Sequence, residues 1–277
     1  MLVDSLPLVL CPEEHIPHYN CYRVADPIWV DGKINEGIWG QVNKSDPFRD
    51  LVSGDDTYLD TRVALVWDDT NLYVAYWVEE PYLQASLLDR DAPIYKDNDV
   101  ELFIAGKNAY YELEINAYNT IYEVFFIWEA SLYRAGYNKL EIFDRSREGV
   151  KMFNGVGMKN HPRGQRIGYW NWDFPGLRHA VSTIGTINDD RDVDQGWHVE
   201  LALPWAGMKM LTLGEEHSLP PKEGDVWRMD FSRFNQRKAP PPQADSGGWA
   251  WSPHGIWDSH IPECFTYIHF IDQYVSP

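Results

Sequence analysis

The chain has few cysteines, and this shortage excludes a protein stabilised by a disulfide framework. Its 277 residues include only Cys11, Cys21 and Cys264, an odd number without the spacing of a zinc site. A chain of this length buries enough surface to fold without covalent staples. Of the pairings, a single bridge between Cys11 and Cys21 near the N-terminus stays open at this stage.

The sequence also lacks a long apolar run. No uninterrupted apolar stretch approaches the roughly 20 residues that a transmembrane helix needs, so we expect a soluble protein without a membrane partner. The apolar stretch at residues 2–10 has no basic segment before it and contains Asp4, which is untypical of a secretory signal. We therefore take the cytoplasm as the default compartment, although removal of a signal would leave the same pattern.

Basic residues are scarce relative to acidic ones. Lys and Arg total 24 against 42 Asp and Glu, which gives a formal net charge of −18. This charge repels phosphate backbones and anionic surfaces, so nucleic acid is not an expected partner. The acidic residues are spread along the chain, as in a solvated surface, and neutral glycans are compatible with them.

Aromatic residues, in contrast, are abundant. The chain has 13 Trp, 16 Tyr and 11 Phe, more than a core of this size requires. Some of these rings are therefore expected to face a ligand.

Strict alternation of apolar and polar residues dominates the sequence and predicts strands. Val63, Leu65 and Trp67 share one face, a turn follows at residues 68–71, and alternation resumes through Val78. Further strands are predicted at residues 100–104, 110–116, 120–126, 196–203, 227–234 and 265–270. Eight or more strands without βαβ alternation favour an all-β protein, an antiparallel β-sandwich with jelly-roll-like or immunoglobulin-like layers.

Helices are expected to be few and short, at residues 35–42 and 205–211. Long loops are expected at residues 129–177, 189–195 and 236–255, and long loops in compact domains are commonly functional. Because no linker separates the strands, we predict a single domain over residues 1–277. Within it, residues 1–25 are expected to form an N-terminal extension that packs on the domain or trails from it.

Six segments in order along the chain resemble the family 9 carbohydrate-binding modules, which are related to the DOMON superfamily. They are residues 31–39 (DGKINEGIW), 61–74 (TRVALVWDDTNLYV), 97–104 (DNDVELFI), 111–116 (YELEIN), 196–205 (GWHVELALPW) and 260–265 (HIPECF). Six ordered matches are much more specific than any one of them. The resemblance implies a β-sandwich that binds a saccharide without catalysing a reaction and acts beside glycoside hydrolases.

The resemblance also implies a set of site residues. In the family two aromatic rings clamp a terminal sugar, and the matching positions here are Tyr95 and Trp257. Glu101 matches a ligand carboxylate and Asn116 a polar strand position, and His260 closes the segment after Trp257. Glu114 stands where the family has a ligand-contacting Arg, so we include it in the site with its charge reversed.

The chemistry of a pyranose explains these residue types. Its C–H face suits a flat aromatic ring, and its hydroxyl groups suit carboxylates and amides. Such a site typically binds at micromolar to millimolar concentrations. Tyr95 and Trp257 lie outside periodic strands, so each ring either contacts a ligand or packs locally. The periodic tryptophans are expected in the core, namely Trp39, Trp67, Trp197, Trp205 and Trp227, while Trp170, Trp172, Trp249 and Trp251 stay unassigned.

Two other functions stay open. Glu101, Glu112 and Glu114 alternate with apolar residues, which is typical of a solvated strand face, and Glu200 fits the same interpretation. If Glu101 and Glu114 instead faced one cleft, the protein would be a glycoside hydrolase. DOMON kinship suggests haem binding through Met and His or Lys, with Met152, Met158 and Met229 available.

Calcium is considered beside haem as a cofactor. Asp97 and Asp99 offer hard oxygen ligands for Ca²⁺, but acidic residues also form turns without a metal.

Overall fold

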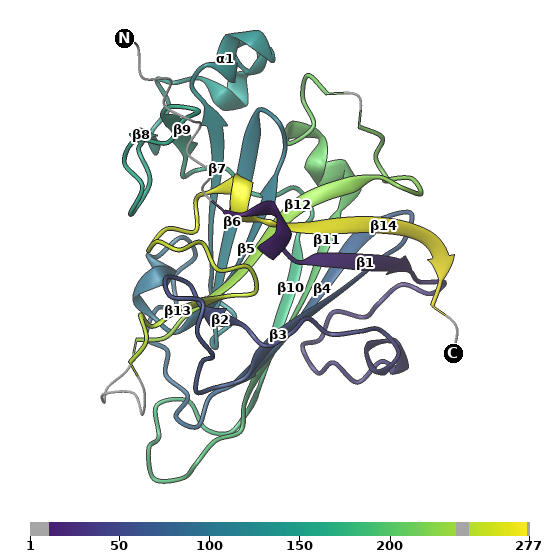
Figure 1. Ribbon diagram of the computed structural model, residues 1–277, viewed down its shortest axis with the longest axis vertical. Coiled ribbons are helices and arrows are strands. Elements are labelled where there is room, and N and C mark those ends of the chain that lie inside the picture. Colours follow the sequence, from purple (N-terminus) through teal and green to yellow (C-terminus); the bar gives the residue numbers. More distant parts are fainter. Residues whose placement is uncertain (1–10, 216, 237–243, 276–277) are drawn as a thin grey trace.

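The computed structural model describes residues 11–215, 217–236 and 244–275, and its strands account for most of the ordered chain (Figure 1). The strands are β1 (His18–Arg23), β2 (Arg49–Asp50), β3 (Thr61–Trp67), β4 (Asn71–Glu79), β5 (Asp99–Ala105), β6 (Ala109–Asn116), β7 (Ile121–Trp128), β8 (Val150–Phe153), β9 (Arg166–Tyr169), β10 (Arg178–Ile184), β11 (Gly196–Pro204), β12 (Val226–Phe234), β13 (Gly248–Ala250) and β14 (Thr266–Tyr274).

Helices in the described ranges are short. They are α1 (Ser131–Arg134) and the 3₁₀ turns η1 (Glu13–His15), η2 (Gly37–Gly40), η3 (Ile94–Lys96), η4 (Tyr137–Lys139), η5 (Glu141–Phe143), η6 (Trp205–Met210) and η7 (Pro262–Cys264). The two helices predicted from sequence correspond to η2 and η6. None of the described helices is long and apolar enough to cross a membrane.

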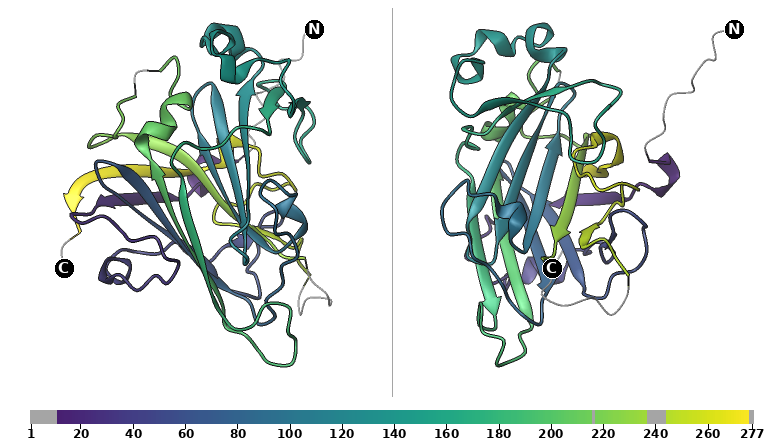
Figure 2. Two further views of the ribbon diagram at one scale, coloured as in Figure 1. Left: turned by 180° about the vertical axis from the view of Figure 1, so that it is seen from behind. Right: turned by 90° about the vertical axis from the view of Figure 1, so that its left-hand side faces the viewer.

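The strands form one continuous curved sheet in the order β10-β11-β4-β3-β1-β14-β12-β5-β6-β7-β9-β8, with β13 and β2 added beside β12. The two halves of this sheet form two layers, seen edge-on in Figure 2. Their facing side chains make one core. Tyr76 of β4, for example, donates a 2.8 Å hydrogen bond to the backbone oxygen of Glu101 on β5. The predicted all-β sandwich is confirmed.

Most strand pairs are antiparallel, and the exception lies where the two halves join. There β1 pairs in parallel with both β14 and β3. The segment expected as an N-terminal extension thus contributes β1, a strand inside the sheet; residues 1–10 lie outside the described part.

The parallel pairing of β1 with β14 also determines which cysteines form the disulfide. His18 is in register with Tyr267, so the residues preceding the two strands lie side by side. Cys11 is bonded to Cys264 with their Cα atoms 5.3 Å apart, while Cys21 is a buried free thiol on β1. The bridge considered between Cys11 and Cys21 is therefore wrong, because sequence proximity did not reveal this strand pairing.

The periodic tryptophans predicted to lie in the core are all buried. Of the unassigned ones, Trp172, Trp249 and Trp251 are also buried, and only Trp170 is partly exposed. The predicted long loop over residues 129–177 is wrong in part. It contains α1, η4, η5, β8 and β9, and β9 pairs with β7 to extend the sheet.

Candidate functional site

A cavity of about 480 Å³ opens on the face of β5, β6 and β7 that points away from the core. It is lined by Tyr95, Glu101, Phe103, Glu112, Glu114, Tyr122, Phe126, Lys151, Phe153, Val156, Trp170, Phe234, Gln236, Trp257, Asp258, Ser259 and His260. Five of the six residues predicted to bind a ligand are brought together here. The sixth, Asn116, is not among the lining residues.

Strand alternation explains the floor of the cavity. On β5 the side chains of Val100 and Leu102 enter the core, so Glu101 and Phe103 point to the opposite face. Glu101, Glu112 and Glu114 were expected on a solvated face, yet they are only 4%, 4% and 2% exposed. That expectation is wrong, because loops from distant parts of the chain cover this face of the sheet.

The register between β5 and β6 places the carboxyl groups of the three glutamates next to one another. Glu101 lies directly opposite Glu114, and Glu112 is two residues before Glu114 on the same face. Ser232 of β12 is opposite Glu101 and donates a 2.8 Å hydrogen bond to its Oε2 atom. The floor of the cavity is thus an acidic row on two neighbouring strands, β5 and β6, with Ser232 of β12 beside it.

Burial makes these carboxyl groups weak acids. Desolvation raises the pKa of Glu101 to about 8 and, together with the neighbouring carboxyls, raises the pKa of Glu112 and Glu114 well above the ordinary value. These shifts favour the protonated form of all three groups.

Aromatic rings form the walls and the rim. Tyr95, 47% exposed, comes from η3, and its ring packs edge-on against Tyr122 with centroids 5.9 Å apart. Trp257, 39% exposed, packs edge-on against Phe234 at 5.1 Å. Trp170 donates a hydrogen bond from its indole nitrogen to the hydroxyl of Tyr122. Because Tyr95 and Trp257 are partly exposed, part of each ring is available to a ligand in the cavity.

Glycines make room for these rings. A Cβ atom at Gly248 would lie 2.8 Å from the Trp257 ring, and one at Gly168 would lie 2.4 Å from the Trp170 ring. Both distances are shorter than a side chain tolerates. The absence of a side chain at these positions is therefore required for the observed ring positions.

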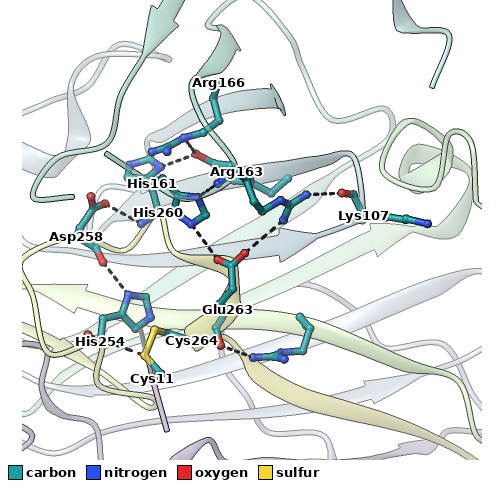
Figure 3. A network of polar contacts seen from close by, with 12 residues as sticks. Cys11, Lys107, His161, Arg163, Arg166, His254, Asp258, His260, Glu263 and Cys264 are labelled. Carbon is teal, nitrogen blue, oxygen red and sulfur yellow. Dashed lines mark hydrogen bonds and ion pairs between the residues drawn. A yellow bond between two sulfur atoms is a disulfide. The ribbon is translucent and has the colours of Figure 1, made fainter. Parts of the chain in front are cut away.

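Asp258 connects loops that cover the floor, and Figure 3 shows its contacts with His254 and His260. Its Oδ2 atom accepts hydrogen bonds from the backbone N–H groups of Val156, Gly157 and Met158, and its Oδ1 atom accepts one from the N–H of His260. Its backbone oxygen contacts the ring of His254 at 2.7 Å. Asp258 thus joins the segment after β8 to the loop that carries Trp257.

His260 lies at the inner end of the cavity. Its ring is 3.2 Å from the hydroxyl of Tyr110 and 3.5 Å from Glu112 Oε1, and it packs on Phe153 with centroids 4.5 Å apart. Burial lowers the pKa of His260 to about 3. The imidazole is therefore neutral at physiological pH and does not compensate the acidic floor.

Asn116 and Asp97 hold a neighbouring loop. The amide of Asn116 donates to the backbone oxygen of Leu87 at 2.9 Å and to Asp97 Oδ2 at 3.0 Å. Asp97 also accepts hydrogen bonds from Ser86 and Leu87. Both carboxylate oxygens of Asp97 are used within the loop that positions η3 and Tyr95.

Among the described residues, Asp97 and Asp99 do not belong to a converging group of three or more potential metal ligands. Asp99 uses Oδ1 to accept the N–H of Phe234 at 3.1 Å. The acidic side chains that do converge, with ligand atoms within 4.8 Å of one another, are Asp31, Glu36 and Glu200. Glu200 is buried and accepts hydrogen bonds from the backbone of Gly32 and the indole of Trp39, so the expectation that it is a solvated strand residue is wrong.

Sequence reasoning missed several lining residues. Tyr122, Phe126 and Phe153 gave no signal because aromatic residues on strands are ordinarily core. Trp170 was singled out but not assigned. The three methionines considered for haem do not line the cavity, and Met229 is buried in the core.

Comparisons with known proteins agree with the fold. A protein from Bacteroides uniformis ATCC 8492, a candidate carbohydrate-binding protein, is 14% identical, with a TM-score of 0.59 over 92% of this chain and 99% of its own. Family 9 modules from Caldicellulosiruptor kristjanssonii in complex with glucose and with cellotriose are 14% and 15% identical. Each has a TM-score of 0.48 over 94% of this chain and 99% and 98% of its own. No curated protein matches the chain.

A family model provides the remaining comparison. Residues 30–153 match the family described as carbohydrate family 9 binding domain-like. This range contains β3 to β7 and therefore the acidic floor of the cavity and Tyr95. The predicted resemblance to family 9 carbohydrate-binding modules is thus confirmed over residues 30–153.

Proposed function

We propose that the protein binds the end of a saccharide in the cavity without catalysing a reaction. The observation that carries this proposal is that Tyr95 and Trp257, two partly exposed rings distant in sequence, line the same cavity as three buried carboxyl groups. The rings suit the C–H faces of a sugar, and the carboxyl groups suit its hydroxyls. The site residues in this proposal are Tyr95, Glu101, Glu114, Trp257 and His260. Asn116 contributes indirectly, through the loop that its hydrogen bonds hold in place.

The carboxyl groups face one cavity, as a glycoside hydrolase would require, but their acidities argue against hydrolysis. A retaining hydrolase needs one ionised nucleophile and one protonated acid, whose pKa values are pushed apart. Here burial raises the pKa of Glu101, Glu112 and Glu114 alike. In none of the three groups do hydrogen bonds that favour the ionised form outweigh the effect of burial, so binding is the better supported function.

The proposed function also implies a class of partner enzyme and a cellular compartment. A non-catalytic sugar-binding domain would act beside glycoside hydrolases, holding a chain end near the enzyme. The disulfide between Cys11 and Cys264 favours an oxidising compartment, where such bonds persist.

Titration calorimetry after a glycan-array screen tests the proposal. Trp257→Ala and Tyr95→Ala should each weaken binding of the best glycan about ten-fold or more, since a stacked ring contributes roughly 1 kcal/mol or more. Matched controls are Trp29→Ala and Tyr133→Ala, whose exposed rings are not among the lining residues. A wild type that binds no glycan, or cavity variants that bind as well as the controls, would contradict the proposal.

A further inference from the structure

The cavity is unusual in its balance of charged groups. Its lining contains the carboxyl groups of Glu101, Glu112, Glu114 and Asp258, but Lys151 is its only Lys or Arg. Lys151 lies at the rim, with its ammonium group 5.6 Å from the centre of the Trp170 ring. The lining therefore offers one Lys side chain, at the rim, against four carboxyl groups.

The four carboxyl groups differ in how many hydrogen bonds their oxygen atoms already accept. Asp258 accepts four backbone hydrogen bonds, and Glu101 accepts one from Ser232. Glu114 uses Oε2 to accept the N–H of Tyr95. Among the described residues, Glu112 has only the ring of His260 at 3.5 Å as a partner. Glu112 and the Oε1 atom of Glu114 thus keep acceptor capacity for a ligand.

Spacing argues against a bare metal ion as that ligand. Acidic side chains that bring three ligand atoms within 4.8 Å of one another occur elsewhere in the described residues, at Asp31, Glu36 and Glu200, and not in the cavity. A single metal ion needs its oxygen ligands converged at 2 to 3 Å from one point. The cavity is lined instead by aromatic side chains such as Tyr122, Phe126 and Trp170, whose faces attract organic cations.

We propose, resting on the function proposed above, that the saccharide end held in this cavity carries a free protonated amine, as in a hexosamine, with its ammonium group directed at Glu112 and Glu114. The ammonium would donate charge-assisted hydrogen bonds to the free acceptors of the floor, while the sugar ring lies against Tyr95 and Trp257.

Selectivity for the amine follows from electrostatics. Burial raises the pKa of both glutamates, and a positive charge beside a carboxyl group favours its ionised form. A hexosamine therefore gains an ion pair that a neutral hexose cannot form. An N-acetylated sugar, whose amide carries no charge, gains nothing either.

Calorimetry at pH 6, where a sugar amine is protonated, tests this inference. The ligands are D-glucosamine and D-galactosamine, compared with D-glucose, D-galactose and N-acetyl-D-glucosamine. Wild type should bind at least one amine about ten-fold or more tighter than its neutral parent. Glu112→Gln and Glu114→Gln keep the side-chain shape but not the charge, so they should lose this preference, with the affinity for the amines falling more than the affinity for neutral sugars. Glu141→Gln, which changes an exposed acid outside the cavity, should keep it.

Each contrary outcome has a distinct meaning. If neutral sugars bind wild type as tightly as the amines, the inference is wrong and the proposed function stands. If glutamine variants with a native circular dichroism spectrum keep the preference, the assignment of Glu112 and Glu114 is wrong. If no saccharide of any kind binds, both proposals fail.

Discussion

The backbone N–H of Tyr95 donates a 2.7 Å hydrogen bond to Glu114 Oε2. This bond ties the rim of the cavity to its floor, because Tyr95 belongs to η3 and Glu114 to β6. The bond restrains the backbone of the short turn that carries this partly exposed ring. The acidic floor therefore has a second role, which is to position an aromatic ring.

Replacing Glu114 should separate the two roles. Glu114→Gln retains an oxygen that can accept the Tyr95 hydrogen bond, so binding of a neutral sugar should change less than about three-fold. Glu114→Ala removes the acceptor and should weaken that binding about ten-fold, in line with the roughly 1 kcal/mol of one hydrogen bond. Calorimetry on both variants checks this. Equal losses in the two variants would show that Tyr95 is not positioned by this bond.

Gly248 should be sensitive to the smallest substitution. A Cβ atom there would meet the Trp257 ring at 2.8 Å and the Phe234 ring at 2.7 Å, so Gly248→Ala must displace one or both rings. We expect saccharide affinity to fall about ten-fold while the fold is retained. Gly40→Ala is the control, since nothing lies within 4 Å of its added Cβ. Unchanged binding by Gly248→Ala would mean that the ring position of Trp257 is unimportant.

Stability should fall as pH rises through the neutral range. The pKa of Glu101 is about 8 in the folded protein against an ordinary value of 4.5, so between these values the folded state holds a proton that the unfolded state has lost. The free energy of unfolding therefore decreases over this window, and Glu112 and Glu114 act in the same direction.

Urea denaturation at pH 5 and pH 8.5 measures this effect. Wild type should lose a few kcal/mol between the two, and Glu101→Gln should reduce the loss by about 2 kcal/mol or more. Glu141→Gln should leave it unchanged. A wild type equally stable at both pH values would show that the acidic floor is not protonated in the folded state.

The disulfide should contribute substantially to stability. It joins residues 253 positions apart, and a bridge across so long a loop strongly restricts the unfolded chain. Removing it with the double substitution Cys11→Ser and Cys264→Ser should cost about 2 to 5 kcal/mol.

Thermal unfolding with and without dithiothreitol checks this prediction. The reductant should lower the Tm of wild type and leave the Tm of the double variant unaltered. An equal shift in both proteins would indicate that the reductant does not act through this disulfide.

Individual residues show which features of the fold and the site could be predicted from the sequence. Alternation predicted the strand that carries Glu101 and the burial of Trp67 and Trp197, because period-two patterning reflects which face of a strand is buried. The same alternation misplaced Glu101 and Glu114 in solvent. A polar face looks the same in sequence whether water or a covering loop lies above it.

The sequence by itself determined the all-β class, most strands, and the resemblance that selected Tyr95 and Trp257, since these depend on local pattern and ordered motifs. Only the tertiary structure decided the partner of Cys11, the burial of the acidic row and the loop-supporting role of Asn116. Those outcomes depend on which distant segments become neighbours, and cross-strand register and loop closure are settled only when the whole sheet folds.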